Sequence, residues 1–446
     1  MESLDLARQV VRKLKSAGHQ AYFVGGCVRD VLLGVEPQDY DIATSARPDE
    51  IVALFPGSGL VGAHFGVVLV RQDNAQVEVA TFRSDHAYVD GRHPAGVTFE
   101  TDPRQDVLRR DFTINALLLD PDRHEVLDFV GGQDDLRNRV IRAIGDPEAR
   151  FREDHLRMLR AVRFAARLDY SIDDHTLSAI QRLHHSIQSV SAERVRDELV
   201  RILVEGGARH GLELLDQAGL LAEILPEVAA MKGVAQPPEF HPEGDVWIHT
   251  LMLLENLRDP SPALALGALL HDVGKPPTFR LADRIRFDGH VEKGLELATA
   301  ILTRLRFPND LIRQVTALVA NHMRFKDAPR MKLSTLKRFL RLENFPEHLE
   351  LHRLDCVSSH GHLENYEFVR RKMEDVPQEL LKPAPLLTGD DLIAAGYRPS
   401  PAFSRMLAAV EDAQLESRLG SREEALAMVQ SQFQPPDGAP VHAKSS

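Results

Sequence analysis

The sequence predicts a multi-domain protein in which an α/β head is followed by an all-α body. The chain has 446 residues, which exceeds the length of a typical single domain. Up to about residue 132, short runs rich in β-branched and aromatic residues alternate with segments of helical spacing. From residue 133 to residue 433 the spacing is helical almost without interruption. We therefore expect a mixed sheet with helices in the head and helices alone beyond it.

The head is expected to alternate strands with helices. Strands are expected at 20–26, 40–44, 64–72, 75–83 and 125–130. Helices are expected at 1–14, 27–34 and 47–55, the last with Pro48 near its start. Residues 84–97 are rich in glycine, histidine and proline, so we expect a mobile loop there.

Proline-rich breaks at 235–244 and 381–389 divide the helical body. Together with the change of pattern near residue 132, they predict five parts. These are a head at 1–132, a neck at 133–235, a histidine-rich domain at 236–380, a helical tail at 381–433 that could contact RNA, and a disordered end at 434–446.

Composition indicates a soluble, cytoplasmic protein. Cys27 and Cys356 are the only cysteines, which excludes a disulfide scaffold and fits a reducing compartment. The N-terminal segment lacks the apolar run of a signal peptide, and no run is long enough to span a membrane. The net charge of −12 argues against a general nucleic-acid coat, but residues 137–167 hold nine arginines against four acids. Guanidinium groups suit phosphate or base contacts, so a local basic surface is expected there.

Residues 24–43, VGGCVRDVLLGVEPQDYDIA, contain two carboxylates one residue apart. Asp39 and Asp41 fall on an expected strand, so the period of two places both on one face. Like charges at this spacing repel unless cations lie between them. Two Mg²⁺ ions would satisfy them and would clamp the attacking and leaving oxygens of a phosphoryl transfer.

The glycine turn upstream of this pair has a complementary role. Gly25 and Gly26 would let backbone N–H groups approach a triphosphate, and Arg29 would add positive charge. A lone pair of aspartates is common on surfaces, but its combination with the glycine turn favours a phosphoryl-transfer site.

These residues resemble the head of the polymerase-β-type nucleotidyltransferases, in the class II group that contains bacterial CCA-adding enzymes and poly(A) polymerases. Three further segments are similar to motifs of that family, namely LRRDFTINALLLD (108–120), DPEARFREDHLRMLRAVRFAARL (146–168) and SAERVRDEL (191–199). In the family these motifs join head to neck, select the nucleotide and support the selecting helix. Together the resembling motifs span about half the chain in the expected order.

The resemblance implies roles for the matching residues. Asp39 and Asp41 would be catalytic and hold Mg²⁺. The residues implied to bind the nucleotide are Gly25, Gly26, Arg29, Arg110, Asp154, Arg157, Arg160 and Arg163. Within that set, Asp154 and Arg157 would face the base, while the two later arginines would line the same cleft.

The base-facing pair also has a physical rationale. Asp154 and Arg157 are three residues apart, so on one helix they would be surface neighbours. A carboxylate acceptor beside guanidinium donors matches the edges of cytosine and adenine, whereas guanine and uracil present different patterns. The alternative is an ordinary intrahelical salt bridge.

A third acidic metal ligand is common in this superfamily. Glu78 has suitable apolar flanks on an expected strand, and Asp111 is a rival. Glu78 could equally be a solvent-facing strand residue, so the third ligand stays open.

A second set of candidate ligands lies between residues 240 and 360, where the segment HDVGKP is the most specific. Imidazoles and carboxylates from several helices can converge on divalent ions with an open water position. The expected ligands are His249, His271, Asp272, His290, His322 and Asp355. Their order resembles an HD-type metal phosphohydrolase fused to a CCA-adding enzyme. That resemblance implies a phosphodiesterase or phosphatase, with the metal identity open and activity less certain than metal binding.

The whole pattern implies a template-independent enzyme that adds or repairs the CCA end of tRNA from CTP and ATP. An RNA 3′-hydroxyl would attack the α-phosphate and pyrophosphate would leave. Enzymes that add only CC or only A, and poly(A) polymerases, share every quoted motif and remain alternatives. A different class of hypothesis makes the head a degenerate RNA-binding module beside an active HD hydrolase. The intact acidic pair argues against it, and the oligomeric state is left open.

Overall fold

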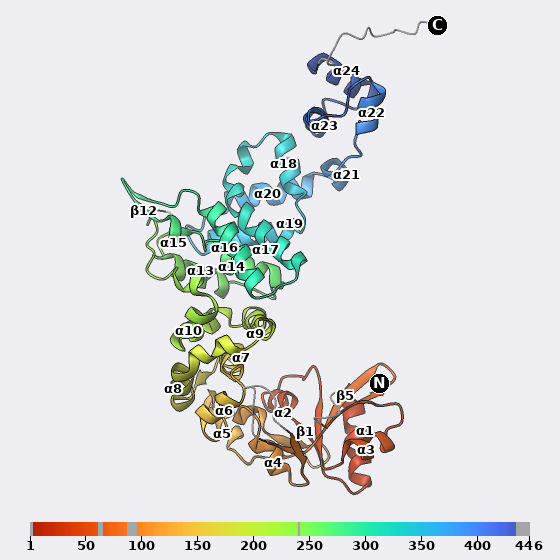
Figure 1. Ribbon diagram of the computed structural model, residues 1–446, viewed down its shortest axis with the longest axis vertical. Coiled ribbons are helices and arrows are strands. Elements are labelled where there is room, and N and C mark those ends of the chain that lie inside the picture. The colour runs from red at the N-terminus through yellow and green to blue at the C-terminus, as the bar shows by residue number, and fades with distance from the viewer. Residues whose placement is uncertain (1–2, 61–65, 87–95, 240, 434–446) are drawn as a thin grey trace.

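The structure is a computed structural model that describes residues 3–60, 66–86, 96–239 and 241–433. The head lies at one end, the helical neck follows it, and the histidine-rich domain and tail continue to the other end (Figure 1). The α/β head followed by a helical body confirms the predicted fold class. None of the helices in these ranges is long and apolar enough to cross a membrane.

A seven-stranded mixed sheet forms the head, with strand order β3-β4-β5-β2-β1-β8-β9. Its strands are β1 (Ala21–Val24), β2 (Asp41–Thr44), β3 (Gly59–Leu60), β4 (Val67–Gln72), β5 (Ala75–Thr81), β8 (Leu118–Asp120) and β9 (Glu125–Leu127). Only β2 and β5 pair in parallel, and the other neighbours are antiparallel. The central strands β1, β2 and β5 therefore fix the positions of the residues that precede or occupy them.

The helices of the head are α1 (Ser3–Ser16), α2 (Gly26–Leu32), α3 (Pro48–Leu54), α4 (Pro103–Leu108) and the 3₁₀ turn η2 (Thr113–Asn115). One face of α1 carries Leu6, Val10 and Leu14, and it packs on β1 and β5. In β5 burial alternates, so Val77 and Val79 point toward α1 while the residues between them face the other side.

The expected loop at 84–97 is partly wrong. Its two ends pair as an antiparallel ribbon of β6 (Arg83–Asp85) and β7 (Val97–Phe99), and the segment 87–95 lies outside the described residues. The ribbon forms because β6 continues directly from β5 and finds a partner edge in β7.

The neck is a stack of short helices. Its elements are α5 (Gly132–Asn138), β10 (Val140–Ile141), α6 (Pro147–Glu153), α7 (Arg157–Leu168), β11 (Ser171–Ile172), α8 (Asp174–Leu183), the 3₁₀ helix η3 (His184–Ser189), α9 (Ala192–Val204), α10 (Ala208–Gln217), α11 (Leu220–Ile224) and α12 (Pro226–Ala229). The helix α7 packs against α9 and α10.

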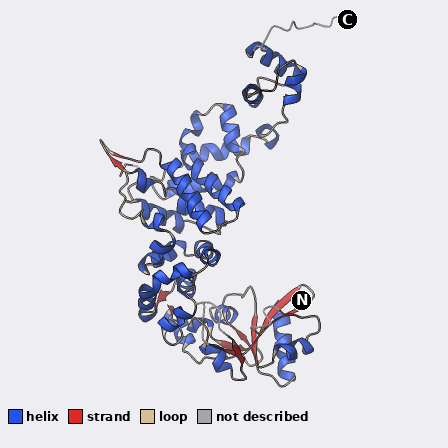
Figure 2. Cartoon of the chain, in the orientation of Figure 1, coloured by secondary structure: helices blue, strands red, loops and turns tan. Residues whose placement is uncertain are grey.

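The histidine-rich domain contains α13 (Val246–Glu255), α14 (Pro262–Leu270), α15 (Lys275–Thr278), β12 (Arg280–Leu281), β13 (Ile285–Arg286), α16 (His290–Arg304), α17 (Asn309–Asn321), η4 (His322–Arg330), α18 (Leu333–Leu340), α19 (Phe345–Val357) and α20 (Glu364–Asp375). The tail contains α21 (Gln378–Leu381), α22 (Gly389–Ala394), α23 (Ala402–Leu415) and α24 (Arg422–Gln432). Among the described residues of the body, strands occur only as the short pairs β10–β11 and β12–β13, and the latter projects as a hairpin (Figure 2).

One apolar core runs from the head through the neck into the histidine-rich domain. It includes Leu6 and Phe23 in the head, Leu199 in the neck and Leu264 and Val319 in the histidine-rich domain. The tail has a separate core formed by α22, α23 and α24. The two candidate sites therefore belong to one packed body.

Candidate active site of the head and metal centre of the body

The acidic residues of the head lie on the face of the sheet opposite α1. Ile42 packs on the α1 side, so Asp41, one residue earlier in β2, projects from the other face. Glu78 lies beside it, because the parallel register of β2 and β5 pairs these two residues. Asp39 is exposed and precedes β2, so the expectation that both aspartates lie on one strand is wrong. Burial raises the pKa of Asp41 to about 6, and the charges of Asp39 and Glu78 act in the same direction.

This carboxylate patch fits a hard divalent cation such as Mg²⁺, whose usual ligands are carboxylate oxygens. Arg110 lowers the pKa of Asp41, but its guanidinium is paired with Asp106 at 2.7 Å. Among the residues described, Asp39, Asp41 and Glu78 do not form a group whose ligand atoms all lie within 4.8 Å of one another. Mutual repulsion accounts for that spread, and a cation would draw the carboxylates together.

Gly25 provides space in front of Asp41. Its φ is +80°, a backbone conformation that favours glycine. A Cβ built at this position would lie 3.8 Å from Asp41 Oδ2 and 3.9 Å from Arg110 Nη1. The glycine thus stands between a carboxylate and a guanidinium, and Gly26 begins α2 directly behind it.

Arg29 does not face solvent in this structure. Its side chain is 3% exposed, Nη1 donates to Asn115 Oδ1 at 2.8 Å, and Nη2 donates to Asp30 Oδ1 at 2.7 Å. The guanidinium therefore braces α2 against η2, and contact with a phosphate would require it to leave these partners.

The nucleotide-selecting segment differs from the expectation. Asp154 and Arg157 do not lie on one continuous helix, because α6 ends at Glu153 and α7 begins at Arg157. Asp154 is extended (φ −148°), and its Oδ1 accepts from the Leu156 N–H at 3.1 Å. Aspartate favours such capping bonds at helix termini, which explains the break. The helical i, i+3 geometry that we expected is therefore wrong.

Both members of that pair have other partners. Asp154 Oδ2 pairs with Arg194 of α9 at 2.7 Å. Arg157 Nη1 pairs with Glu153 at 2.5 Å and donates to the Arg150 carbonyl at 3.2 Å. Asp154 and Arg157 are therefore not held by an ion pair with each other. Residues of α6 and α9 fix the positions of the carboxylate and the guanidinium.

The two later arginines differ in exposure. Arg160 binds the Asp111 carboxylate through Nε and Nη2 at 2.9 and 2.7 Å. Arg163 is 2% exposed and pairs with Glu198 at 2.7 Å and Glu205 at 3.3 Å. The expectation that Arg163 lines the cleft is wrong, because its guanidinium is held inside the neck by the carboxylates of Glu198 and Glu205.

These contacts also separate the rival third ligands. Asp111 forms an ion pair with Arg160, whereas Glu78 lies next to Asp41 in the sheet register. Sequence reasoning did not single out Asn115 and Arg194, although both lie inside the quoted motifs. Their role is to hold other polar groups, and such partners have no sequence signal of their own.

Six candidate ligands of the body converge from different helices. They are His249 in α13, His271 and Asp272 after α14, His290 at the start of α16, His322 at the start of η4 and Asp355 in α19. His249, His271 and Asp355 form one group whose ligand atoms lie within 4.8 Å of one another, and Asp272, His290 and His322 form a second. His249 Nε2 lies 3.1 Å from Asp355 Oδ1, and His271 Nε2 lies 3.2 Å from Asp272 Oδ2.

The imidazoles are oriented for metal coordination. The Nδ1 atoms of His271, His290 and His322 bond to backbone carbonyls three residues upstream, at 2.9, 2.9 and 2.7 Å. If each Nδ1 carries the proton, each Nε2 offers a lone pair. The Nε2 atoms of these residues and of His249 are buried and have no hydrogen-bond partner among the described residues. A divalent ion would fit, since it would satisfy groups that burial otherwise leaves unpaired.

Sequence reasoning missed Glu243, which holds the fourth imidazole. Its Oε1 lies 2.7 Å from His249 Nδ1 and 2.9 Å from His241 Nδ1. Burial alone would lower the pKa of His249, but the nearby carboxylates of Asp355 and Glu243 raise that pKa to about 9. Glu243 lies in the proline-rich break before α13, where the sequence pattern indicated only a boundary.

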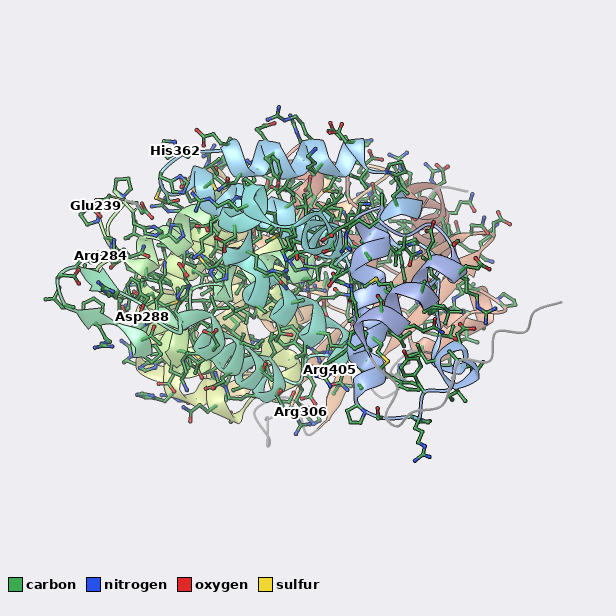
Figure 3. The ribbon with its side chains drawn as sticks, turned by 90° about the horizontal axis from the view of Figure 1, so that it is seen from above. Glu239, Arg284, Asp288, Arg306, His362 and Arg405 are labelled. Atoms are coloured by element: carbon green, nitrogen blue, oxygen red, sulfur yellow. The ribbon has the colours of Figure 1, made fainter. Side chains whose placement is uncertain are left out.

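A cavity of about 590 Å³ is lined by four of these candidate ligands, Asp272, His290, His322 and Asp355. Lys275 lies at its base with Nζ 2.6 Å from Asp272 Oδ2, and Arg284, Phe287 and His362 are part of its wall. Viewed from above, Arg284, Asp288 and His362 lie on the same side of the molecule (Figure 3). The cavity therefore joins a buried ligand cluster to a mouth with basic residues.

Fold and sites together define a nucleotidyltransferase-type head on a helical body with an HD-type ligand cluster. Three family models match the chain: the poly A polymerase head domain at 21–142, the probable RNA- and SrmB-binding site of polymerase A at 169–232, and the HD domain at 245–354. The chain is therefore similar to bacterial CCA-adding enzymes and poly(A) polymerases in three consecutive domains, which confirms the resemblance that the sequence motifs predicted.

Relatives within this family are similar over part of their length. The CCA-adding enzyme of Enterococcus faecalis is 46% identical over 206 residues, covering 46% of this chain and 50% of the relative. The CCA-adding enzyme of Levilactobacillus brevis is 44% identical over 219 residues, covering 49% of this chain and 55% of the relative. The chain thus spans about half the length of these curated relatives.

Solved structures match over nearly the whole chain. The CCA-adding enzyme of Bacillus stearothermophilus in complex with CTP has a TM-score of 0.75 and 27% identity, covering 97% of this chain and 98% of that one. The Thermotoga maritima CCA-adding enzyme complexed with tRNA has a TM-score of 0.60 at 20% identity, a likeness of fold alone.

Proposed function

We propose that this protein is a template-independent tRNA nucleotidyltransferase that builds or repairs the 3′-terminal CCA from CTP and ATP. The observation that carries the proposal is the placement of Asp41 beside Glu78, with Asp39 in electrostatic reach, in front of Gly25 and Arg110. The similarity to a CCA-adding enzyme solved with CTP supports it.

In this proposal Asp39 and Asp41 hold Mg²⁺, and Glu78 supplies the third carboxylate. Bound Mg²⁺ would lower the pKa of the attacking 3′-hydroxyl and neutralise charge on the departing pyrophosphate. Gly25 leaves room for the triphosphate beside Asp41, and Arg110 offers guanidinium donors next to it. No protein nucleophile is required, because the RNA hydroxyl attacks the α-phosphate directly.

Base selection in this proposal uses Asp154 and Arg157 from the break between α6 and α7. The carboxylate would accept from the amino group that cytosine and adenine share, and the guanidinium would donate to a ring acceptor. Arg194 and Glu153, which now pair with these side chains, would keep them oriented while a base binds. Side chains would thereby serve as the template.

The test uses tRNA transcripts that end before the CCA, after C or after CC. Each is incubated with CTP, ATP or both, and the products are sized. Complete CCA ends on all three would support the proposal. Addition that stops after CC, adds only A, or continues into long A tails would instead identify a CC-adding, A-adding or poly(A) enzyme.

We also propose a metal-dependent phosphohydrolase activity for the histidine-rich domain. The observation that favours it is the buried set of unpaired Nε2 atoms beneath a cavity of about 590 Å³. His249, His271, Asp272, His290, His322 and Asp355 would hold one or two divalent ions. A bound ion would supply a nucleophilic water at neutral pH, and Lys275 would add positive charge beside the phosphate.

This second activity is tested with phosphate monoesters and cyclic phosphodiesters of nucleotides and of RNA ends. The protein is stripped of metal and reloaded separately with Mn²⁺, Co²⁺, Ni²⁺, Zn²⁺ or Mg²⁺. Release of phosphate or opening of the cyclic ester with at least one ion supports the proposal. If the domain binds metal but hydrolyses none of these substrates with any of the ions, its metal site has a structural role.

A further inference from the structure

A third group of potential ligands lies in the neck, apart from both sites described above. His184 and His185 belong to η3, and Glu223 belongs to α11, which packs against η3. The two Nδ1 atoms and one carboxylate oxygen all lie within 4.8 Å of one another. The group involves no residue of the head site or of the histidine-rich domain.

Both imidazoles point at the same carboxylate oxygen. Glu223 Oε1 lies 2.6 Å from His185 Nδ1 and 3.3 Å from His184 Nδ1. The other oxygen, Oε2, accepts from the Gln188 side-chain amide. Only 11% of the Glu223 side chain is exposed, so this carboxylate contacts its three partners and is largely shielded from solvent.

Hydrogen bonding alone does not satisfy this cluster. His184 Nδ1 is buried and makes no hydrogen bond within the described ranges, although Glu223 Oε1 lies nearby. Gly219, with φ +80°, lies against the ring, since a Cβ there would be 3.1 Å from His184 Cγ. The imidazole is therefore held in place with one buried nitrogen unpaired, which is costly unless another ligand completes it.

The spacing suits a tetrahedral ion. At Zn–N and Zn–O distances near 2.0–2.1 Å, neighbouring ligand atoms of a tetrahedron are separated by about 3.3 Å. The His184–Glu223 separation is already 3.3 Å. His185 must move outward by less than an ångström from its 2.6 Å contact, and its side chain is 74% exposed and free to do so.

We propose that His184, His185 and Glu223 form a binding site for a divalent transition ion of the Zn²⁺ type. Two imidazoles and one carboxylate are ligands that such ions accept, whereas Mg²⁺ prefers oxygen ligands alone. The exposed side of His185 leaves a fourth position for water. A bound ion would link η3 to α11 and so fasten the two parts of the neck.

The test counts metal on the full-length chain. Protein stripped with a chelator is reloaded with Zn²⁺, separated from free ion by gel filtration, and measured by elemental mass spectrometry. H185A and E223Q should each lose one equivalent of Zn²⁺ relative to the unaltered chain. Because loss of a mere supporting partner weakens metal affinity about 10- to 100-fold, loss of a direct ligand should weaken it by about 100-fold or more.

The histidine-rich domain also offers metal ligands, so the count is repeated in an H271A background. H185A and E223Q should again remove one equivalent there, and Zn²⁺ should raise the unfolding temperature of H271A but not of H271A/E223Q. H175A, an exposed histidine on α8, is the matched control and should lose nothing. The proposal is overturned if H185A and E223Q bind as much Zn²⁺ as H175A, or if excess Mg²⁺ displaces the ion.

Discussion

The two main sites of this protein are built in opposite ways. In the head, Asp39, Asp41 and Glu78 sit at a partly open sheet face and do not converge tightly. In the histidine-rich domain the ligands are mostly buried, and three imidazoles are oriented by bonds to their own helix backbones. The difference teaches that the fold alone brings the candidate ligands of the second site together. In the proposed mechanism the first site would need a cation, and the triphosphate that accompanies it, to draw its carboxylates together.

The largest expected effect is that of Asp41→Ala on the head. Removing one of the carboxylates proposed to hold Mg²⁺ should reduce nucleotide addition at least about 1000-fold, equivalent to several kcal/mol of transition-state stabilisation. Addition to a tRNA ending in CC is measured with ATP, alongside tRNA binding, which should be largely retained. Metal content of the histidine-rich domain is the internal control, and undiminished addition would refute the head assignment.

His271→Ala makes the reciprocal change. Loss of this buried ligand should weaken metal binding in the histidine-rich domain by about 100-fold or more and remove its phosphohydrolase activity, while nucleotide addition is unchanged. Metal affinity is measured by competition with a chromophoric chelator. A parallel fall in nucleotide addition would mean that the two sites are not independent.

Arg157→Ala sharpens the description of the head. One base-directed guanidinium is worth about 1–3 kcal/mol of discrimination, so the preference for CTP and ATP over UTP and GTP should fall about 10- to 100-fold. Competitive incorporation with all four nucleotides measures this preference. If instead all nucleotides lose affinity equally, Arg157 contacts the phosphates and not the base.

Glu243→Gln tests how the fold orients His249. Its carboxylate lies 2.7 Å from His249 Nδ1, and replacement by a neutral amide should weaken metal affinity about 10- to 100-fold. The effect is read by isothermal titration with Zn²⁺. Glu239→Gln, an exposed change in the same segment, is the control and should bind metal normally.

The remaining expected effect is a gain in stability. The folded-state pKa of Asp41 is raised by burial and by Asp39 and Glu78 to about 6, so the native state binds a proton that the unfolded state has released. Stability of the metal-free protein therefore falls as pH rises from about 4 to about 6, and the cost persists above pH 6. Asp41→Asn should remove that cost and stabilise the metal-free protein at pH 8 by about 3 kcal/mol.

Urea unfolding in excess chelator measures this gain. Arg71→Gln, an exposed substitution elsewhere on the same sheet, serves as the control for general changes in surface charge. A destabilised Asp41→Asn variant would show that the carboxylate is not under strain in the absence of metal.

The sequence predicted the fold of the head and the clustering of the candidate ligands in the body, because both depend on local patterns. The strand around β5 is an alternation of apolar and polar residues, and the segment HDVGKP marks the end of α14 where two ligands lie. Glu78 could be named as a candidate because its strand was recognisable, but its position beside Asp41 depends on the parallel pairing of β2 and β5.

The sequence failed where long-range partners decide the conformation. Asp154 looked helical, yet it is the extended residue that follows α6, accepts from the Leu156 N–H and pairs with Arg194, forty residues away along the chain. Arg163 looked like a cleft residue, yet Glu198 and Glu205 bury it in the neck. Glu243 looked like part of a linker, and only the folded chain brings it to His249.

The continuous apolar core that links α1 to α17 restricts how an RNA end could move between the two sites. Moving the head toward the histidine-rich domain would break contacts along the neck and expose apolar surface. That exposure costs a free energy of about 25 cal/mol for each Å². If both proposed activities act on one RNA, its terminus would therefore have to dissociate from one centre and bind again at the other. The order of the two proposed reactions would then be decided by dissociation and not by bending of the chain.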